Sequence, residues 1–175
     1  GGRGRVSRAG TGGNRCACGP FCAGTRGAER DVPIGRLWLN WGMRLWVLPY
    51  PQAEQLFRRM VFNVLARNCD DHTKNFACTM DQSGEWSLSP AFDVCHAYRP
   101  SSTWVSQHCL SVNGKRKDIE RKDLLEVARK MNIKGASALI DQVDQVIGKW
   151  NDYADEQKVE PALRKAIGHT LLRMP

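Results

Sequence analysis

The chain has 175 residues, of which 42% are hydrophobic and 25% are charged, as expected of a single globular domain with a buried core. No run of residues approaches the roughly 18 apolar positions that a membrane helix needs. The seven scattered Cys favour a reducing compartment over a disulfide framework. These features exclude a transmembrane or disulfide-rich secreted protein, and we expect a soluble, cytoplasmic protein.

The net charge of +8 is concentrated near the N-terminus. Residues 1–50 hold eight Arg and two acidic residues, whereas the remaining 125 residues hold 18 basic and 16 acidic groups. Together with 11 of the 16 Gly and no Lys before Pro49, this composition predicts that residues 1–48 are a separate Arg/Gly-rich segment, disordered or encoded out of frame. Residues 49–175 are expected to form the folded domain.

The first predicted helix covers Gln52–Arg67. Its apolar residues recur at intervals of three and four and form one continuous stripe, which is the pattern of a helix packed on a core. The stripe consists of Leu56, Phe57, Met60, Val61, Val64 and Leu65. Asn68 and the pair Asp70–Asp71 are expected to end the helix, because Asn and Asp favour local hydrogen bonds with the backbone.

One β-hairpin and three further helices are predicted beyond this helix. The hairpin strands are Phe76–Met80 and Glu85–Leu88, and a loop over residues 99–117 contains an Asn113–Gly114 turn. Apolar periodicity places the helices at Glu120–Met131, Ala136–Ala154 and Glu160–Arg173. The predicted fold class is therefore α+β and mostly helical, with one short β-hairpin.

Two motifs on either side of the hairpin carry the polar residues that phosphoryl transfer needs. They are Asn68-Cys69-Asp70-Asp71-His72-Thr73-Lys74-Asn75-Phe76 and Ser89-Pro90-Ala91-Phe92-Asp93-Val94. Transfer to a hydroxyl requires a carboxylate that accepts the proton and oxygen ligands that hold Mg²⁺ against the phosphates. Asp70, Asn75 and Asp93 occur in this order and predict a base followed by two metal ligands.

The two motifs resemble the catalytic loop and the metal-binding Asp of HipA-family serine/threonine kinases, and the first is also similar to the catalytic loop of phosphoinositide kinases. The matching residues are Asp70, His72, Lys74, Asn75 and Phe76 in the first motif, and Leu88, Ser89, Pro90, Phe92 and Asp93 around the second. The resemblance runs from Pro51 to about residue 172. It implies that residues 49–175 are the C-terminal lobe of a HipA-like, phosphoinositide-kinase-like fold.

The resemblance also implies a role for each matching polar residue. Asp70 would accept the proton of the substrate hydroxyl. Asn75 and Asp93 would bind Mg²⁺ and, through it, ATP. His72 would support the loop or the transferring phosphate, and Lys74 would offset phosphate charge.

Kinases of this family need an N-terminal lobe that holds ATP, and its signatures are missing. No Lys precedes Lys74, and the glycines of residues 10–13 lack the flanking strand of a phosphate-binding loop. We therefore expect the truncated chain to be inactive by itself and to bind Mg-ATP weakly or not at all. The family further implies a bacterial toxin–antitoxin pair. Its partners would be a protein substrate with a Ser or Thr hydroxyl, and a helix-turn-helix antitoxin through which DNA is contacted.

Three alternatives remain open. If Asp71 rather than Asp70 faced the substrate, the assignment of the base would move by one residue. A zinc site could instead draw its ligands from Cys69, His72, Cys95, His96, His108 and Cys109, or from a loop around Cys16, Cys18 and Cys22 that would need a fourth ligand. Finally, the basic N-terminal segment could be a nucleic-acid-binding arm of a non-catalytic module.

Overall fold

Five helices and a small antiparallel sheet make up the described part of this computed structural model, which is residues 15–17 and 49–174. In chain order the elements are β1 (Arg15–Ala17), α2 (Tyr50–Leu65), the 3-10 turn η3 (Thr73–Asn75), β2 (Cys78–Met80), β3 (Trp86–Leu88), α3 (Arg121–Lys130), α4 (Ala136–Gly148), α5 (Trp150–Glu156) and α6 (Pro161–Gly168). This is the α+β, mostly helical class that the sequence predicts. Apart from the backbone of β1, the predictions for residues 1–48 lie outside the described residues.

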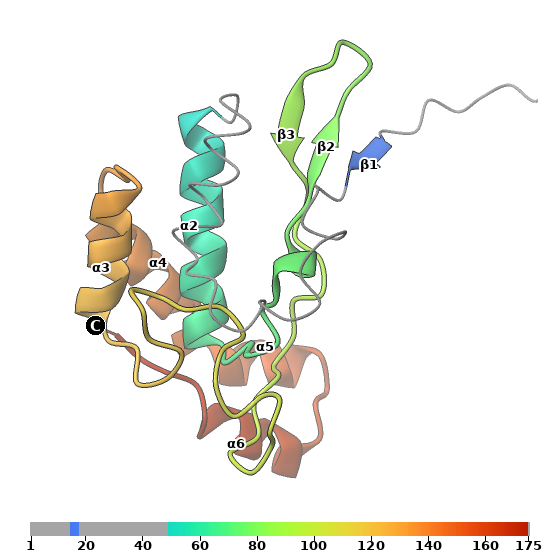
Figure 1. The fold of residues 1–175 in the computed structure, drawn as a ribbon. Helices are drawn as coiled ribbons and strands as arrows, with labels where there is room; N and C mark the ends of the chain where they lie inside the picture. Colours follow the sequence, from blue (N-terminus) through green and yellow to red (C-terminus); the bar gives the residue numbers. More distant parts are fainter. Residues whose placement is uncertain (1–14, 18–48, 175) are drawn as a thin grey trace, which may run out of the picture.

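The long helix α2 stands at the centre of the fold (Figure 1). It begins at Tyr50, two residues before the predicted start, because Pro51 is tolerated in a first helical turn, where the backbone N–H has no helical partner. The predicted apolar stripe is confirmed, since its six side chains are all buried. These are Leu56, Phe57, Met60, Val61, Val64 and Leu65, each at most 2% exposed.

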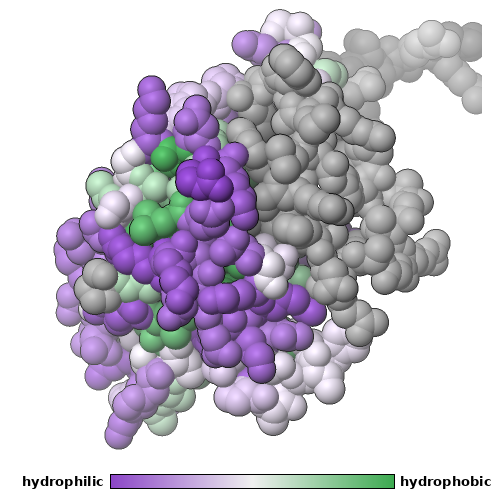
Figure 2. Space-filling view, turned by 60° about the vertical axis from the view of Figure 1, so that its left-hand side comes forward, coloured by the Kyte–Doolittle hydropathy of each residue, from purple (hydrophilic) through white to green (hydrophobic). Residues whose placement is uncertain are grey.

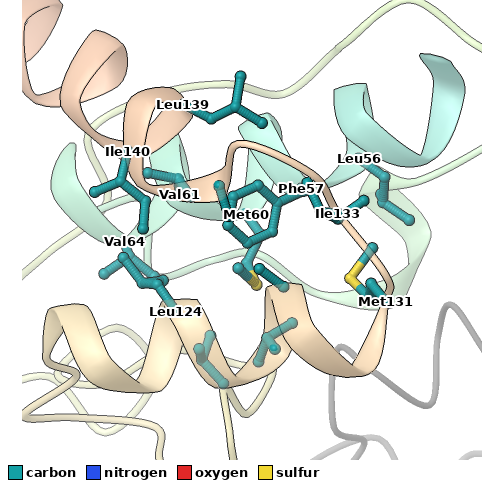
Figure 3. Close-up of a cluster of buried hydrophobic side chains, with 14 of the residues drawn as sticks. Leu56, Phe57, Met60, Val61, Val64, Leu124, Met131, Ile133, Leu139 and Ile140 are labelled. Atoms are coloured by element: carbon teal, nitrogen blue, oxygen red, sulfur yellow. The ribbon is translucent and has the colours of Figure 1, made fainter. Parts of the chain in front are cut away.

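The helices α3 and α4 complete the core on either side of this stripe. Figure 3 shows Leu124 of α3 and Ile140 of α4 packed near Val64 of α2. A capping box begins α3, where the side chains of Glu120 and Asp123 satisfy backbone N–H groups that have no helical partner. The surface on the α3 side of the molecule is largely hydrophilic (Figure 2), as expected of a helix with one buried face.

The predicted hairpin is confirmed, and the structure adds a third strand to it. β2 pairs with β3 in antiparallel register, with Cys78 opposite Leu88, and Asp81 Oδ1 accepts the Ser83 and Glu85 N–H groups in the turn (both 2.9 Å). The edge of β2 pairs with β1, which lies in a segment predicted to lack structure. A three-residue strand is too short to show periodicity, and its pairing depends on backbone groups rather than on side-chain pattern.

The two predicted C-terminal helices are corrected by the structure. The helix expected at Ala136–Ala154 is divided into α4 and α5 at Lys149, and the helix expected at Glu160–Arg173 ends as α6 at Gly168. Gly148 lies beside the first break, and a Cβ atom there would meet the Arg173 guanidinium at 2.8 Å. Gly is a poor helix residue, so each helix ends where the apolar stripe alone would continue it.

The C-terminal segment returns to the end of α2 (Figure 1). The Leu172 N–H donates to Leu65 O at 2.9 Å, and the Asp144 carboxylate on α4 accepts bonds from the Met174 N–H (2.6 Å) and from the Arg173 guanidinium (2.6 and 3.0 Å). These contacts fix the end of the helix from which the site begins. No helix among the described residues has the length and apolar character to cross a membrane.

Candidate functional site

The predicted catalytic loop, residues 68–76, follows the C-terminal end of α2 and lies between two other segments. Arg67, with a φ of 59°, turns the chain out of the helix. On one side the Cys69 N–H donates to Ala97 O, and on the other the Cys109 N–H donates to Cys69 O, both at 3.1 Å. Three segments that are far apart in sequence therefore meet at the start of this loop.

Asp71 is a buried residue that faces away from solvent. Its side chain is 1% exposed and lies 3.0 Å from Nδ1 of His108. One carboxylate oxygen also accepts the Cys109 N–H at 2.8 Å and the Leu110 N–H at 3.3 Å. Because its oxygens are enclosed by these donors, Asp71 is not placed to meet a substrate, and the alternative that moves the base by one residue is disfavoured.

Asp70, in contrast, is exposed on the opposite side of the loop. Its backbone oxygen accepts a hydrogen bond from Asn75 Nδ2 at 3.0 Å, and its carboxylate lies 3.9 Å from the Cys109 thiol. The bond from Asn75 closes the loop over Asp70 and uses the nitrogen of the Asn75 amide. The exposed carboxylate of Asp70 is thus open to a substrate.

Asn75 and Asp93 line one pocket of about 470 Å³, although they are separated by the whole hairpin. Asp93 adopts a φ of 52°, a left-handed conformation that Asp tolerates better than most residues. Asn68 Nδ2 contacts the Asp93 backbone oxygen at 3.4 Å and Asn63 Oδ1 at 3.1 Å, which connects the second motif to α2. Carboxylate and amide oxygens are a donor set that suits Mg²⁺.

Arg59 of α2 brings a positive charge to the wall of this pocket. Its Nη2 donates to Ser89 O at 2.5 Å, while its Nη1 is buried and has no hydrogen-bond partner among the described residues. Burial lowers the pKa of the guanidinium, and the charge of Cys78 opposes this effect. Sequence reasoning missed Arg59, because in the sequence it is only one of several Arg on a helix.

His72 and Lys74 take other positions in the loop. The His72 backbone oxygen accepts the Asn75 N–H at 3.0 Å and closes η3, and its Nδ1 is buried without a partner in the described region. Lys74 is exposed and is not among the residues that line the pocket with Asn75 and Asp93. Of the five predicted site residues, the structure therefore brings Asn75 and Asp93 to one pocket and Asp70 to the loop beside it.

The zinc cluster considered as an alternative does not assemble in residues 49–174. His96 Nε2 is bonded to Thr170 Oγ1 at 2.7 Å, and His108 is paired with Asp71. Across this described region, no three His, Cys, Asp or Glu side chains are placed to share a metal ion. The correction has a plain cause, since His96 and His108 are bonded to different partners in the fold.

His108 is the residue whose role the sequence did not show. Burial by itself would lower the pKa of its imidazole, but hydrogen bonding with Asp71 and Cys69 and the charges of both groups raise that pKa to about 9. The raised pKa favours the charged form of the imidazole, whose Nδ1 is hydrogen-bonded to the buried Asp71 carboxylate. Because the two residues are 37 positions apart, no local pattern could have connected them.

Comparison with known protein families shows to which family this chain belongs. The model of the HipA-like C-terminal domain matches residues 43–150, which is more than half of the sequence. This chain belongs to the HipA-like C-terminal domain family. The match includes α2, the loop, the hairpin, α3 and α4, and with them Asp70, Asn75 and Asp93. A comparison with curated proteins finds no relative of the chain.

Proposed function

We propose that this site belongs to a kinase that transfers the γ-phosphoryl group of Mg-ATP to a Ser or Thr hydroxyl of a protein. The observation that carries the proposal is the pocket that Asn75 and Asp93 share, beside a loop on which Asp70 is exposed and Asp71 is buried. Membership of the HipA-like family supports the same activity.

In this proposal each side chain either accepts a proton or neutralises the negative charge of the phosphates. Asp70 accepts the proton of the attacking hydroxyl, which a positioned carboxylate does with a gain of about 10²–10⁴-fold in rate. Asn75 and Asp93 hold Mg²⁺, which neutralises phosphate charge when it is bound. Arg59 offsets further negative charge in the same pocket, a role for which the exposed Lys74 was the candidate from sequence.

By family analogy, the biological partner is a helix-turn-helix antitoxin that contacts DNA, and the substrate is a protein. Nothing in the site selects one substrate, because a fold and a catalytic loop do not determine which protein is recognised. The basic N-terminal segment, which could bind nucleic acid directly, lies outside the described residues.

The proposal is tested by replacing Asp70 with Asn, which keeps the size of the side chain and removes the base. Transfer of ³²P from Mg-[γ-³²P]ATP to a protein acceptor is measured for the chain alone and for the chain mixed with a separately expressed N-terminal lobe of a HipA-like kinase. We expect transfer in the mixture, and about a 10²–10⁴-fold loss with Asp70→Asn.

The matched control is Asp118→Asn, the same chemical change at an exposed position with a φ of 51°, which Asn also tolerates. This variant should transfer phosphate at the wild-type rate. A wild-type rate with Asp70→Asn would show that Asp70 is not the base. Calorimetry with millimolar Mg-ATP tests the further expectation that the chain alone binds nucleotide weakly.

A further inference from the structure

Asp71, which follows the candidate base in the chain, and His108 form a buried, hydrogen-bonded pair. Both side chains are 1% exposed, and Asp71 Oδ2 lies 3.0 Å from His108 Nδ1. A charge that is removed from water is costly unless it is paired and hydrogen-bonded. The carboxylate of Asp71 therefore has a strong preference for one position, in which His108 and two backbone N–H groups all reach it.

The segment that carries His108 is itself fixed in place. The His108 N–H donates to Arg116 O at 2.8 Å, and Arg116 Nε donates to His108 O at 2.6 Å. The Val112–Lys115 bridge closes the turn between them. Asp71 is thus bonded to residues 108–116, a segment that is held in place by its own hydrogen bonds. The contact between Asp71 and His108 therefore restricts the movement of the loop as well.

The position of Asp71 determines the direction in which Asp70 points. Along the loop, Cys69 is buried, Asp70 is exposed and Asp71 is buried. The burial of these three side chains thus alternates between core and solvent, as it does where successive side chains point to opposite faces. Fixing Asp71 toward the core therefore directs the Asp70 carboxylate outward, and a rotation of Asp71 out of its site would turn Asp70 away from the open face.

We propose that Asp71 and His108 are positioning residues for Asp70, and that the hydrogen bond between them keeps the base directed at the substrate hydroxyl. This inference rests on the proposed function. In this inference Asp71 aligns Asp70. His108 acts through Asp71 and does not contact the substrate or the nucleotide.

Two substitutions of His108 separate the hydrogen bond from simple filling of space. His108→Leu fills a similar volume but donates no hydrogen bond to Asp71. His108→Asn presents its amide nitrogen near the position of Nδ1 and so retains a donor. The full 175-residue chain is used for both variants, and each is measured in two ways.

The first measurement is amide hydrogen exchange, which needs no catalytic activity. With His108→Leu we expect exchange at the Cys69 and Cys109 amides to become at least about 10-fold faster, because a loss of roughly 1.4 kcal/mol changes an opening equilibrium tenfold. The amide of Ile140 in the middle of α4 serves as the reference and should be unaffected. His108→Asn should return the loop amides to within about threefold of the wild-type rates.

The second measurement is the phosphoryl-transfer assay described above. A displaced base lowers kcat, whereas nucleotide binding does not depend on Asp70, so we expect His108→Leu to lower kcat by about 10–100-fold with little change in KM for ATP. His108→Asn should restore most of kcat. A merely structural role would lower the folded fraction instead, and would not separate kcat from KM in this way.

Several results would overturn the inference. These are unchanged exchange at Cys69 and Cys109, equal acceleration at Ile140, no recovery with His108→Asn, or a faster-exchanging loop with wild-type kcat. If the wild-type mixture transfers no phosphate, the proposed function fails by itself. The exchange measurement then still decides whether the Asp71–His108 pair orders the loop, and unchanged exchange refutes that as well.

Discussion

His108 has an imidazole that is almost completely enclosed. The ionisable groups beside it are Asp71 and Cys69, both from the loop of residues 68–76, and Arg116 donates to its backbone oxygen. The pKa of His108 is raised from 6.5 to about 9 in the folded protein. A group with a raised pKa contributes stability that is complete below the unfolded pKa and is lost as pH rises through the folded pKa. At about 1.4 kcal/mol per pKa unit, we expect the free energy of unfolding to fall by about 3 kcal/mol between pH 6 and pH 10.

Urea unfolding at several pH values measures this effect, and His108→Asn is its control. The Asn variant lacks a titrating group at position 108, so its stability should change less over the same range. The remaining change comes from groups such as Cys109, whose pKa is raised to about 11 by burial and by the charges of Asp71 and Asp70. If wild type and variant lose equal stability, His108 does not carry a proton in the folded protein.

At the scale of elements, α3 offers two adjacent leucines in opposite environments. Leu124 is 0% exposed and packs in the core, while Leu125 is 38% exposed. Leu124→Ala should lower the free energy of unfolding by about 2–5 kcal/mol, because it removes buried methyl groups and leaves a cavity. Leu125→Ala should change it by less than about 1 kcal/mol. Equal effects in urea unfolding would contradict the packing of α3 against α2.

The helices show which structural features a sequence pattern can predict and which it cannot. The stripe of α2 was predicted completely, because burial of one helical face leaves a periodic record in the sequence. The breaks at Lys149 and after Gly168 were missed, since an apolar stripe continues through a kink. Gly148 and Gly168 were visible signals at both ends, and giving them more weight would have shortened both predicted helices.

Only part of the site could be predicted from the sequence, because the rest depends on contacts between segments that are far apart in the chain. The spacing of Asp70, Asn75 and Asp93 gave the candidates, but it could not distinguish Asp70 from Asp71. That distinction depends on the Cys109 and Leu110 N–H groups, which are supplied by a segment almost 40 residues away. Arg59 was missed for the same reason, because only the fold brings it to the pocket of Asn75.

At the scale of the whole molecule, the C-terminal segment packs on the core and lies beside the end of α2, where the loop of residues 68–76 begins. Met174 is 7% exposed, Arg121 Nη1 donates to its backbone oxygen at 2.5 Å, and Leu172 bonds to Leu65 at the end of α2. Two sets of contacts therefore hold the loop in place. The Asp71–His108 pair holds the loop itself, and the C-terminal segment holds the end of α2 from which the loop begins.

Asp144 tests the second set of contacts. Its side chain is 6% exposed while its partner Arg173 is 53% exposed, so removing the carboxylate leaves no buried charge unpaired. Because hydrogen bonds to charged groups are stronger than neutral ones, Asp144→Ala should lower the free energy of unfolding by about 1–3 kcal/mol. It should also speed hydrogen exchange at the Leu172 amide. Asp141→Ala on the same helix is the control, since the Asp141 side chain is 45% exposed and its ion pair with Arg121 should contribute at most about 1 kcal/mol. Exchange at Leu172 that is as slow in Asp144→Ala as in Asp141→Ala would show that the C-terminal segment stays on α2 without this carboxylate.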